Sequence, residues 1–238
     1  MNDHLVMISG KSSTGKSSSL RNLAKPESVM YLCTENNKRL PFKSGFKEYN
    51  ITDPLQVIEA FEKAEEMDKI ETIIIDSLTF LMDQYESQYV LTSTNKMTAW
   101  GEFAQYFKNM MTLNVARSSK NVIFTAHTLD IMNEADMCLE TKIPVKGSLK
   151  NNGLESYFST VVSTKVLPLN KLKGYENPLL EITEDEEILG MKYVFQTRLT
   201  KETVGERIRS PLGMWSKEET YIDNDVQKLM NRLHEYYK

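Results

Sequence analysis

The residues best suited to chemistry lie near the start of the chain, where positions 10–17 read Gly-Lys-Ser-Ser-Thr-Gly-Lys-Ser. They match G-x-x-x-x-G-K-[ST] at every fixed position, and the glycines of this pattern let backbone N–H groups turn toward phosphates. Lys16 is placed to reach the β- and γ-phosphates of a nucleotide, and Ser17 to ligate Mg²⁺. The pattern predicts a site for ATP and Mg²⁺ made of Gly10, Lys11, Ser12, Ser13, Thr14, Gly15, Lys16, Ser17 and Ser18.

A second candidate ligand for Mg²⁺ is Asp76, which ends the apolar run Glu-Thr-Ile-Ile-Ile-Asp at positions 71–76. Phosphate-loop enzymes hold their metal with a carboxylate at the end of a neighbouring strand. The same acid could cap a helix that starts after it, and the two roles are compatible. Because this is the one acid that ends an otherwise apolar strand, we interpret Asp76 as a metal ligand.

The elements that must position these side chains alternate along the chain between expected strands and expected helices. This order predicts an α/β fold with a mainly parallel, twisted sheet flanked by helices. A strand before the phosphate loop and a helix after it argue against a chance match by a Ser/Gly-rich turn. Expected strands cover residues 4–9, 29–34, 71–76, 122–126, 191–200 and 206–210, and expected helices cover residues 17–24, 54–67, 77–89, 97–117 and 223–237. The last helix is amphipathic, residues 128–150 read as an irregular loop, and residues 184–187 read as a solvated acidic loop. We expect one domain over residues 1–238.

The overall composition excludes several classes of protein. A net charge of −4 and a pI of about 5.6 argue against a strongly basic nucleic-acid-binding protein, so such binding would need a local patch. The two cysteines, Cys33 and Cys138, form no metal-binding or disulfide pattern. No apolar run reaches the length of a membrane span and the start lacks the features of a signal peptide. We therefore expect a cytoplasmic protein without a membrane partner.

The ordered set of strand ends resembles the RecA-like recombinase ATPases. The strand at residues 29–34 is followed by Glu35, which the resemblance makes the group that polarises the attacking water. Ile-Ile-Ile-Asp-Ser-Leu at positions 73–78 is similar to the magnesium strand of that family. Val-Ile-Phe-Thr-Ala-His at 122–127 resembles its γ-phosphate-sensing strand, with His127 where the family often has glutamine. The simpler alternatives are a surface acid at position 35 and a structural histidine at position 127.

The same resemblance implies that the protein binds single-stranded DNA as a homo-oligomer, a ring or a filament, with ATP at subunit interfaces. The compact chain is similar to the phage-encoded single-strand-annealing and recombination branch, which would place it in the host cytoplasm and suggests a single-strand-binding protein as a further partner. Residues 128–150 take the place of a DNA-binding loop, with Lys142, Lys146 and Lys150 as phosphate contacts. Candidates for a cation reaching a neighbour's γ-phosphate are Lys201, Arg207 and Arg209, which could equally be a basic surface strand.

Two other functions remain open at this point. One is a phosphate-loop kinase of a small molecule, whose own lid would supply the basic residues. The other is a regulatory or helicase-loader-type ATPase that binds a protein, with which the acidic balance is compatible. Tyr85 and Tyr89 also have two interpretations, because they could stack on bases or pack one face of a helix on the core.

Overall fold

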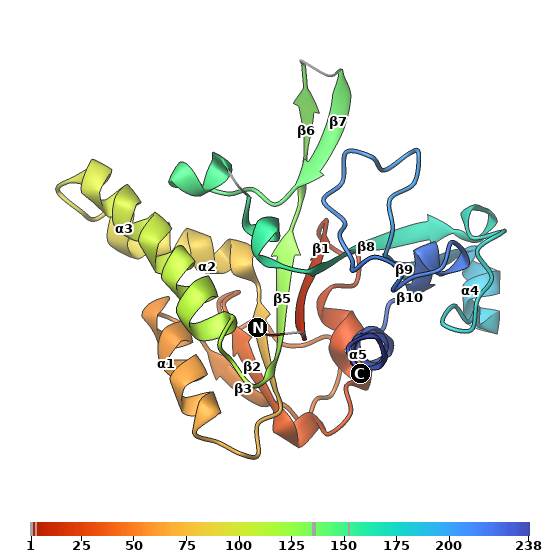
Figure 1. The fold of residues 1–238 in the computed structure, drawn as a ribbon, viewed down its shortest axis with the longest axis horizontal. Helices are drawn as coiled ribbons and strands as arrows, with labels where there is room; N and C mark the ends of the chain where they lie inside the picture. The colour runs from red at the N-terminus through yellow and green to blue at the C-terminus, as the bar shows by residue number, and fades with distance from the viewer. Residues whose placement is uncertain (1, 3, 135–136, 152) are drawn as a thin grey trace.

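An eight-stranded sheet forms the centre of the molecule, with strand order β10-β9-β8-β1-β5-β4-β2-β3 (Figure 1). The computed structural model describes residues 2, 4–134, 137–151 and 153–238, without the side chains of residues 150 and 151. The strands of the sheet are β1 (Leu5–Gly10), β2 (Val29–Cys33), β3 (Lys47–Asn50), β4 (Thr72–Asp76), β5 (Asn121–His127), β8 (Thr160–Pro168), β9 (Met191–Gln196) and β10 (Tyr221–Asp223).

Helices cover both faces of this sheet. The α-helices are α1 (Leu55–Glu65), α2 (Leu78–Tyr85), α3 (Lys96–Asn109), α4 (Glu184–Leu189) and α5 (Val226–Tyr236). α2 and α3 each continue into a π-helical turn, at Glu86–Val90 and Met110–Val115. Short 3-10 helices occupy Ser17–Asn22, Pro26–Ser28, Gly147–Asn151, Leu154–Tyr157, Leu169–Lys171 and Glu218–Thr220. No helix among the described residues is long and apolar enough to cross a membrane.

The pairing of the strands brings the candidate site residues to one edge. β3, β2, β4, β5, β1 and β8 run parallel, whereas β9 is antiparallel to β8 and β10 is antiparallel to β9. β5 lies between β1 and β4. The register of β1 with β5 places His127 opposite Gly10, and the register of β2 with β4 places Asp76 opposite Cys33. Since parallel strands all end on the same side, the phosphate loop, Asp76 and His127 meet there. The predicted α/β fold with a mainly parallel sheet is confirmed.

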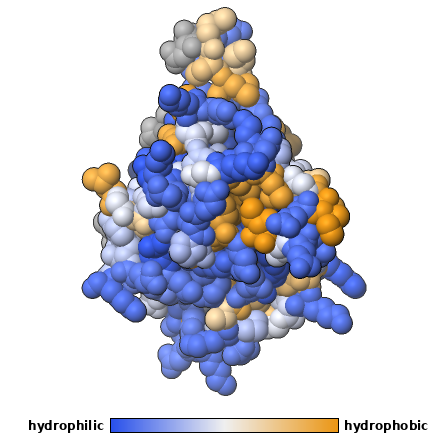
Figure 2. All heavy atoms as spheres, turned by 90° about the vertical axis from the view of Figure 1, so that its right-hand side faces the viewer, coloured by the Kyte–Doolittle hydropathy of each residue, from blue (hydrophilic) through white to orange (hydrophobic). Residues whose placement is uncertain are grey.

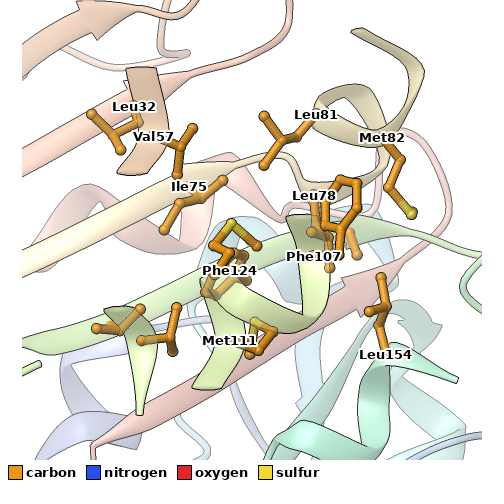
Figure 3. Close-up of a cluster of buried hydrophobic side chains, with 14 of the residues drawn as sticks. Leu32, Val57, Ile75, Leu78, Leu81, Met82, Phe107, Met111, Phe124 and Leu154 are labelled. Carbon is orange, nitrogen blue, oxygen red and sulfur yellow. The ribbon is translucent and has the colours of Figure 1, made fainter. Parts of the chain in front are cut away.

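Two apolar clusters fill the two faces of the sheet, as the period of two in a strand requires. Met7 of β1 packs on one face, with residues of α1, α2 and α3. Figure 3 shows part of this cluster, with Val57 of α1, Leu81 of α2 and Phe107 of α3. Val6 and Ile8 pack on the other, with residues of α5. Nearly uninterrupted burial of β1, β2 and β4 explains their continuous apolar sequences.

Three expectations about local structure are wrong. Residues 128–150 contain a protruding hairpin of β6 (Leu129–Asn133) and β7 (Cys138–Lys142) instead of an irregular loop. These strands are hard to predict from the sequence because their apolar side chains are exposed and do not mark one buried face of a sheet. Residues 206–210 form only isolated bridges, from Glu206 to Thr141 and from Arg209 to Val161. The acidic run at 184–187 begins α4, where Thr183 and Glu186 form a capping box.

Candidate functional site

The phosphate loop follows β1, and the Lys16 side chain bonds back to the loop backbone. Ser13 and Gly15 have φ values of 62° and 94°, which curve the backbone around the place for an anion. The Lys16 ammonium donates to the carbonyls of Gly10 at 3.0 Å and Lys11 at 2.7 Å. Burial lowers the pKa of Lys16 to about 8, although Asp76 and Glu35 act in the opposite direction. A buried cation held by loop carbonyls is poised to exchange them for phosphate oxygens.

The predicted magnesium ligands lie in contact. The Ser17 hydroxyl donates to Oδ2 of Asp76 at 2.7 Å, and the Tyr31 hydroxyl donates to the same oxygen at 2.8 Å. Thr125 donates to the other carboxylate oxygen from β5. Mg²⁺ prefers oxygen ligands and takes only one or two carboxylates beside substrate phosphates and water. Ser17 and Asp76 therefore fit Mg²⁺, and no cluster of three or more His, Cys, Asp or Glu side chains in the described part of the chain offers a different metal centre.

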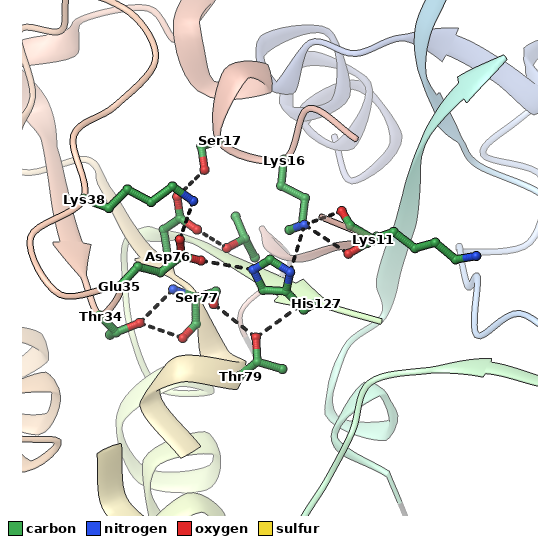
Figure 4. Close-up of polar contacts among 12 residues, drawn as sticks. Lys11, Lys16, Ser17, Thr34, Glu35, Lys38, Asp76, Ser77, Thr79 and His127 are labelled. Atoms are coloured by element: carbon green, nitrogen blue, oxygen red, sulfur yellow. Dashed lines mark hydrogen bonds and ion pairs between the residues drawn. The ribbon is translucent and has the colours of Figure 1, made fainter. Parts of the chain in front are cut away.

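Glu35, His127 and Lys16 form a continuous polar chain (Figure 4). His127 Nε2 lies 3.1 Å from Glu35 Oε1, and its Nδ1 lies 3.4 Å from Nζ of Lys16. Because an ammonium can only donate, Nδ1 must be the acceptor and the ring proton lies on Nε2. His127 thus joins the strand-end acid to the loop lysine.

A cation that the sequence interpretation missed, Lys38, also contacts Glu35. Its ammonium lies 2.6 Å from Glu35 Oε2, and the Glu35 side chain is only 7% exposed. Burial alone would raise the pKa of Glu35, but the hydrogen bonds from His127 and Lys38 outweigh it and lower the pKa to about 2. The carboxylate is therefore ionised at neutral pH and oriented from both sides. The spacing of Glu35 and Lys38 directly after a strand could have suggested this pair.

The hairpin is tied directly to the phosphate loop. Lys11 forms an ion pair with Asp130 of β6, and Asp130 also accepts from Thr141 of β7 at 2.7 Å. The backbone N–H of Thr128, which joins β5 to β6, donates to the Gly10 carbonyl at 3.2 Å. A change in the loop can therefore reach both strands of the hairpin.

Most of the basic residues that were predicted to contact DNA or a neighbour's γ-phosphate line one cavity of about 730 Å³ beside the hairpin. Its walls include Lys142, Lys146, Arg207 and Arg209. Each of these cations has a partner in its own chain: Lys142 and Arg207 contact Glu140, Lys146 contacts Asp83 and Glu86, and Arg209 donates to the carbonyls of Ser156 and Phe158. Lys201 is exposed and does not line this cavity. The Lys150 side chain lies outside the described part of the structure.

The tyrosines of α2 and the turn after it belong to the core. Tyr85 is buried among Phe103, Tyr106 and Phe107. Tyr89 donates its hydroxyl to Asp53. The alternative of base stacking is therefore wrong for the buried Tyr85.

Comparison with known proteins identifies the family. A family model described as an AAA domain matches residues 3–184, which is more than half of the chain. A search of curated proteins finds no match. The matched region contains the phosphate loop together with Glu35, Asp76 and His127. The chain therefore belongs to the AAA-domain family of phosphate-loop ATPases.

Proposed function

We propose that this ATPase binds single-stranded DNA in an ATP-dependent manner and acts in annealing or recombination of phage DNA. The observation that carries the proposal is the direct link from the phosphate loop to a hairpin beside a cavity walled by cations. ATP and Mg²⁺ are the cofactors for which the site is suited. ATP hydrolysis would change the position of the hairpin, and the position of the hairpin would set the affinity for DNA.

Hydrolysis uses the polar contacts that connect Lys16, His127 and Glu35. Lys16 leaves the loop carbonyls and pairs with the β- and γ-phosphates. Ser17 and Asp76 would hold Mg²⁺, which would supply charge neutralisation. Glu35 orients the attacking water. Its carboxylate is ionised at neutral pH and can accept a hydrogen bond from that water. His127 keeps Glu35 aligned with Lys16.

Coupling to the hairpin follows from two contacts that phosphates would compete for. Lys11 is 61% exposed at its side chain and is held by Asp130, so a terminal phosphate offers it a second anionic partner. His127 ends β5 only two residues before β6 begins, so a shift of its ring toward phosphate moves the base of the hairpin. ATP then favours one hairpin position and ADP another, which changes DNA affinity.

The proposed DNA path is the cavity beside the hairpin. Lys142, Lys146 and Arg207 can exchange their carboxylate partners for DNA phosphates, and the flanking apolar walls include Ile131 and Ile143. Such contacts do not depend on base sequence and weaken with salt. A single-strand-binding protein is a further proposed partner on the same DNA.

We also propose that the ATPase assembles as a ring or filament with ATP between subunits. Lys201 and Arg207 support this, because both are exposed and could approach a neighbour's γ-phosphate. Arg209 is the weakest of the three candidates, since its guanidinium already bonds backbone carbonyls. A trans cation would add to Lys11 and Lys38, which lie near the site within one chain.

The test is anisotropy of a labelled single-stranded oligonucleotide across a salt series, with and without Mg-ATP. Combined replacement of Lys142, Lys146 and Lys150 by alanine should lower the salt slope by about 0.7 for each phosphate that the protein no longer neutralises. The matched control replaces three exposed lysines of other surfaces, Lys63, Lys69 and Lys108, and should leave the slope unchanged. ATP-independent binding, or equal slopes in the two triple variants, would contradict the proposed path.

A second candidate function, a regulatory or loader-type ATPase with a protein partner, is favoured by the surface of the hairpin. Figure 2 shows apolar side chains on the projection above the body of the molecule. The exposed apolar residues of the hairpin are Leu129, Ile131, Met132, Met137 and Leu139. Apolar patches of this kind mark protein contacts. DNA binding that fails while a protein binds the hairpin would favour this function.

A further inference from the structure

A buried amide without a partner lies against the phosphate loop. Asn224 connects β10 to α5 and is only 3% exposed. Neither its Nδ2 nor its Oδ1 has a hydrogen-bond partner among the described residues. Burying such a donor and acceptor unpaired is unfavourable, so this amide calls for an explanation.

The backbone around Asn224 is fixed, which leaves the amide in a defined position. The Asn224 carbonyl accepts from Arg21 at 3.1 Å, and the next residue, Asp225, caps α5 and binds Asn22. Asn224 Oδ1 lies 2.9 Å from the place that a Cβ on Gly15 would take. Gly15 thus permits close contact between the phosphate loop and this amide.

The amide also borders a cavity of about 590 Å³ on one flank of the loop. Ser18 and Arg21 contribute to its floor, while Phe42 and Tyr193 give it two aromatic walls. This volume lies within the range of small-ligand sites. Charged side chains, among them Glu181, Glu186 and Lys192, line the cavity as well. The Tyr193 ring is about half exposed and adjoins Gly15 beside Asn224.

The direction of a bound nucleotide decides what enters this cavity. Lys16, Glu35 and His127 mark the place of the terminal phosphate. A triphosphate therefore runs from that end past Ser17 toward Ser18, and the nucleoside leaves the loop beside Ser18. The cavity lined by Ser18 is thus the one that receives the base.

We propose that Asn224 recognises the adenine base of ATP and sets the preference for adenine over guanine. This inference rests on the proposed ATP-binding function and adds the residue that selects the nucleotide. A carboxamide accepts from the N6 amino group of adenine and donates to an adjacent ring nitrogen, the same pairing by which asparagine reads adenine in DNA. Phe42 and Tyr193 stack on the ring. Movement of the Tyr193 ring opens the amide to the base.

The experiment compares three ligands by calorimetry: ATP, purine riboside triphosphate, which lacks the N6 amino group, and inorganic tripolyphosphate. The wild-type protein should bind ATP about tenfold more tightly than purine riboside triphosphate. Asn224→Ala should bind these two equally while retaining tripolyphosphate affinity. Asn224→Asp, which keeps the acceptor and loses the donor, should move the preference from ATP toward GTP by about tenfold or more.

The matched controls are Asn231→Ala and Asn231→Asp, which alter an exposed asparagine of α5 and should leave every ratio unchanged. Equal wild-type affinity for ATP and purine riboside triphosphate overturns the proposal without any variant. A uniform loss of all three ligands in Asn224→Ala also overturns it, because the amide would then position the loop. Failure of the wild-type protein to bind either ATP or tripolyphosphate would instead refute the proposed ATP function.

Discussion

Replacing Lys16 by methionine should stabilise the nucleotide-free protein while removing its response to ATP. Lys16 is 6% exposed, and burial lowers its pKa from 10.5 to about 8. At about 1.4 kcal/mol per pKa unit, the charged form destabilises the folded state by roughly 3 kcal/mol at pH 7. The variant also gives up the two bonds from the ammonium to loop carbonyls, each contributing about 1 kcal/mol, which leaves a net gain of about 1 kcal/mol.

The stability difference between wild type and Lys16→Met should depend on pH, and the pKa of Lys16 gives the direction of that dependence. Between pH 8 and pH 10.5 the unfolded chain keeps the Lys16 proton that the folded chain has released. The unfolded state then binds more protons, so the Lys16 contribution makes wild-type stability rise with pH in this window. Below pH 8 the penalty is fully present. The difference in stability between wild type and Lys16→Met should therefore shrink as pH increases through this window.

Thermal unfolding followed by circular dichroism is the assay. At pH 7 without nucleotide, Lys16→Met should unfold roughly 2–4 °C above wild type. Mg-ATP should raise the Tm of wild type and leave that of the variant unchanged. The control is Lys11→Met, which alters an exposed lysine of the same loop and should give no such gain. A Lys16→Met protein that unfolds at or below the wild-type temperature at pH 7 would refute the reasoning.

Three further predictions concern hydrolysis and assembly. Glu35→Gln should retain ATP binding and lower turnover by at least about a hundredfold, measured by phosphate release, and abolished binding would show that Glu35 has another role. Asp76→Asn should remove the strengthening of ATP binding by Mg²⁺ in calorimetry, because the variant lacks the carboxylate that faces Ser17; an intact Mg²⁺ effect would place the metal elsewhere. Mixing Lys16→Ala with a chain lacking Lys201, Arg207 and Arg209 should restore part of the ATPase activity, whereas co-assembled mixtures that stay inactive would indicate a site completed within one chain.

Local patterns in the sequence predict the parts of the site that follow one another along the chain. The phosphate loop needs only its own glycines, lysine and serine in order, and Asp76 stands out as the acid ending an apolar strand. The resemblance to RecA-like ATPases points to a polar group at His127, and this side chain bridges Lys16 and Glu35. The fold class is equally predictable, because buried parallel strands have continuous apolar sequences.

The parts that sequence patterns miss depend on neighbours far apart along the chain. Tyr31 and Thr125 hold Asp76 only because β2 and β5 flank β4, and no pattern in one strand reports that register. Asn224 meets the phosphate loop from near the opposite end of the chain. The hairpin escapes prediction for a different reason: its alternation, seen at Leu129 and Ile131, places apolar side chains in solvent instead of a core.

The measurement that tests the central claim most directly is steady-state phosphate release from Mg-ATP by the purified protein, with and without a single-stranded oligonucleotide. A DNA-coupled ATPase should hydrolyse ATP, and the rate should change when the oligonucleotide is added because the hairpin and Lys11 join the two sites. Protein that binds ATP but releases phosphate at the same rate with and without the oligonucleotide would contradict that coupling. Protein that transfers the γ-phosphate to a small molecule instead of water would contradict the ATPase assignment itself.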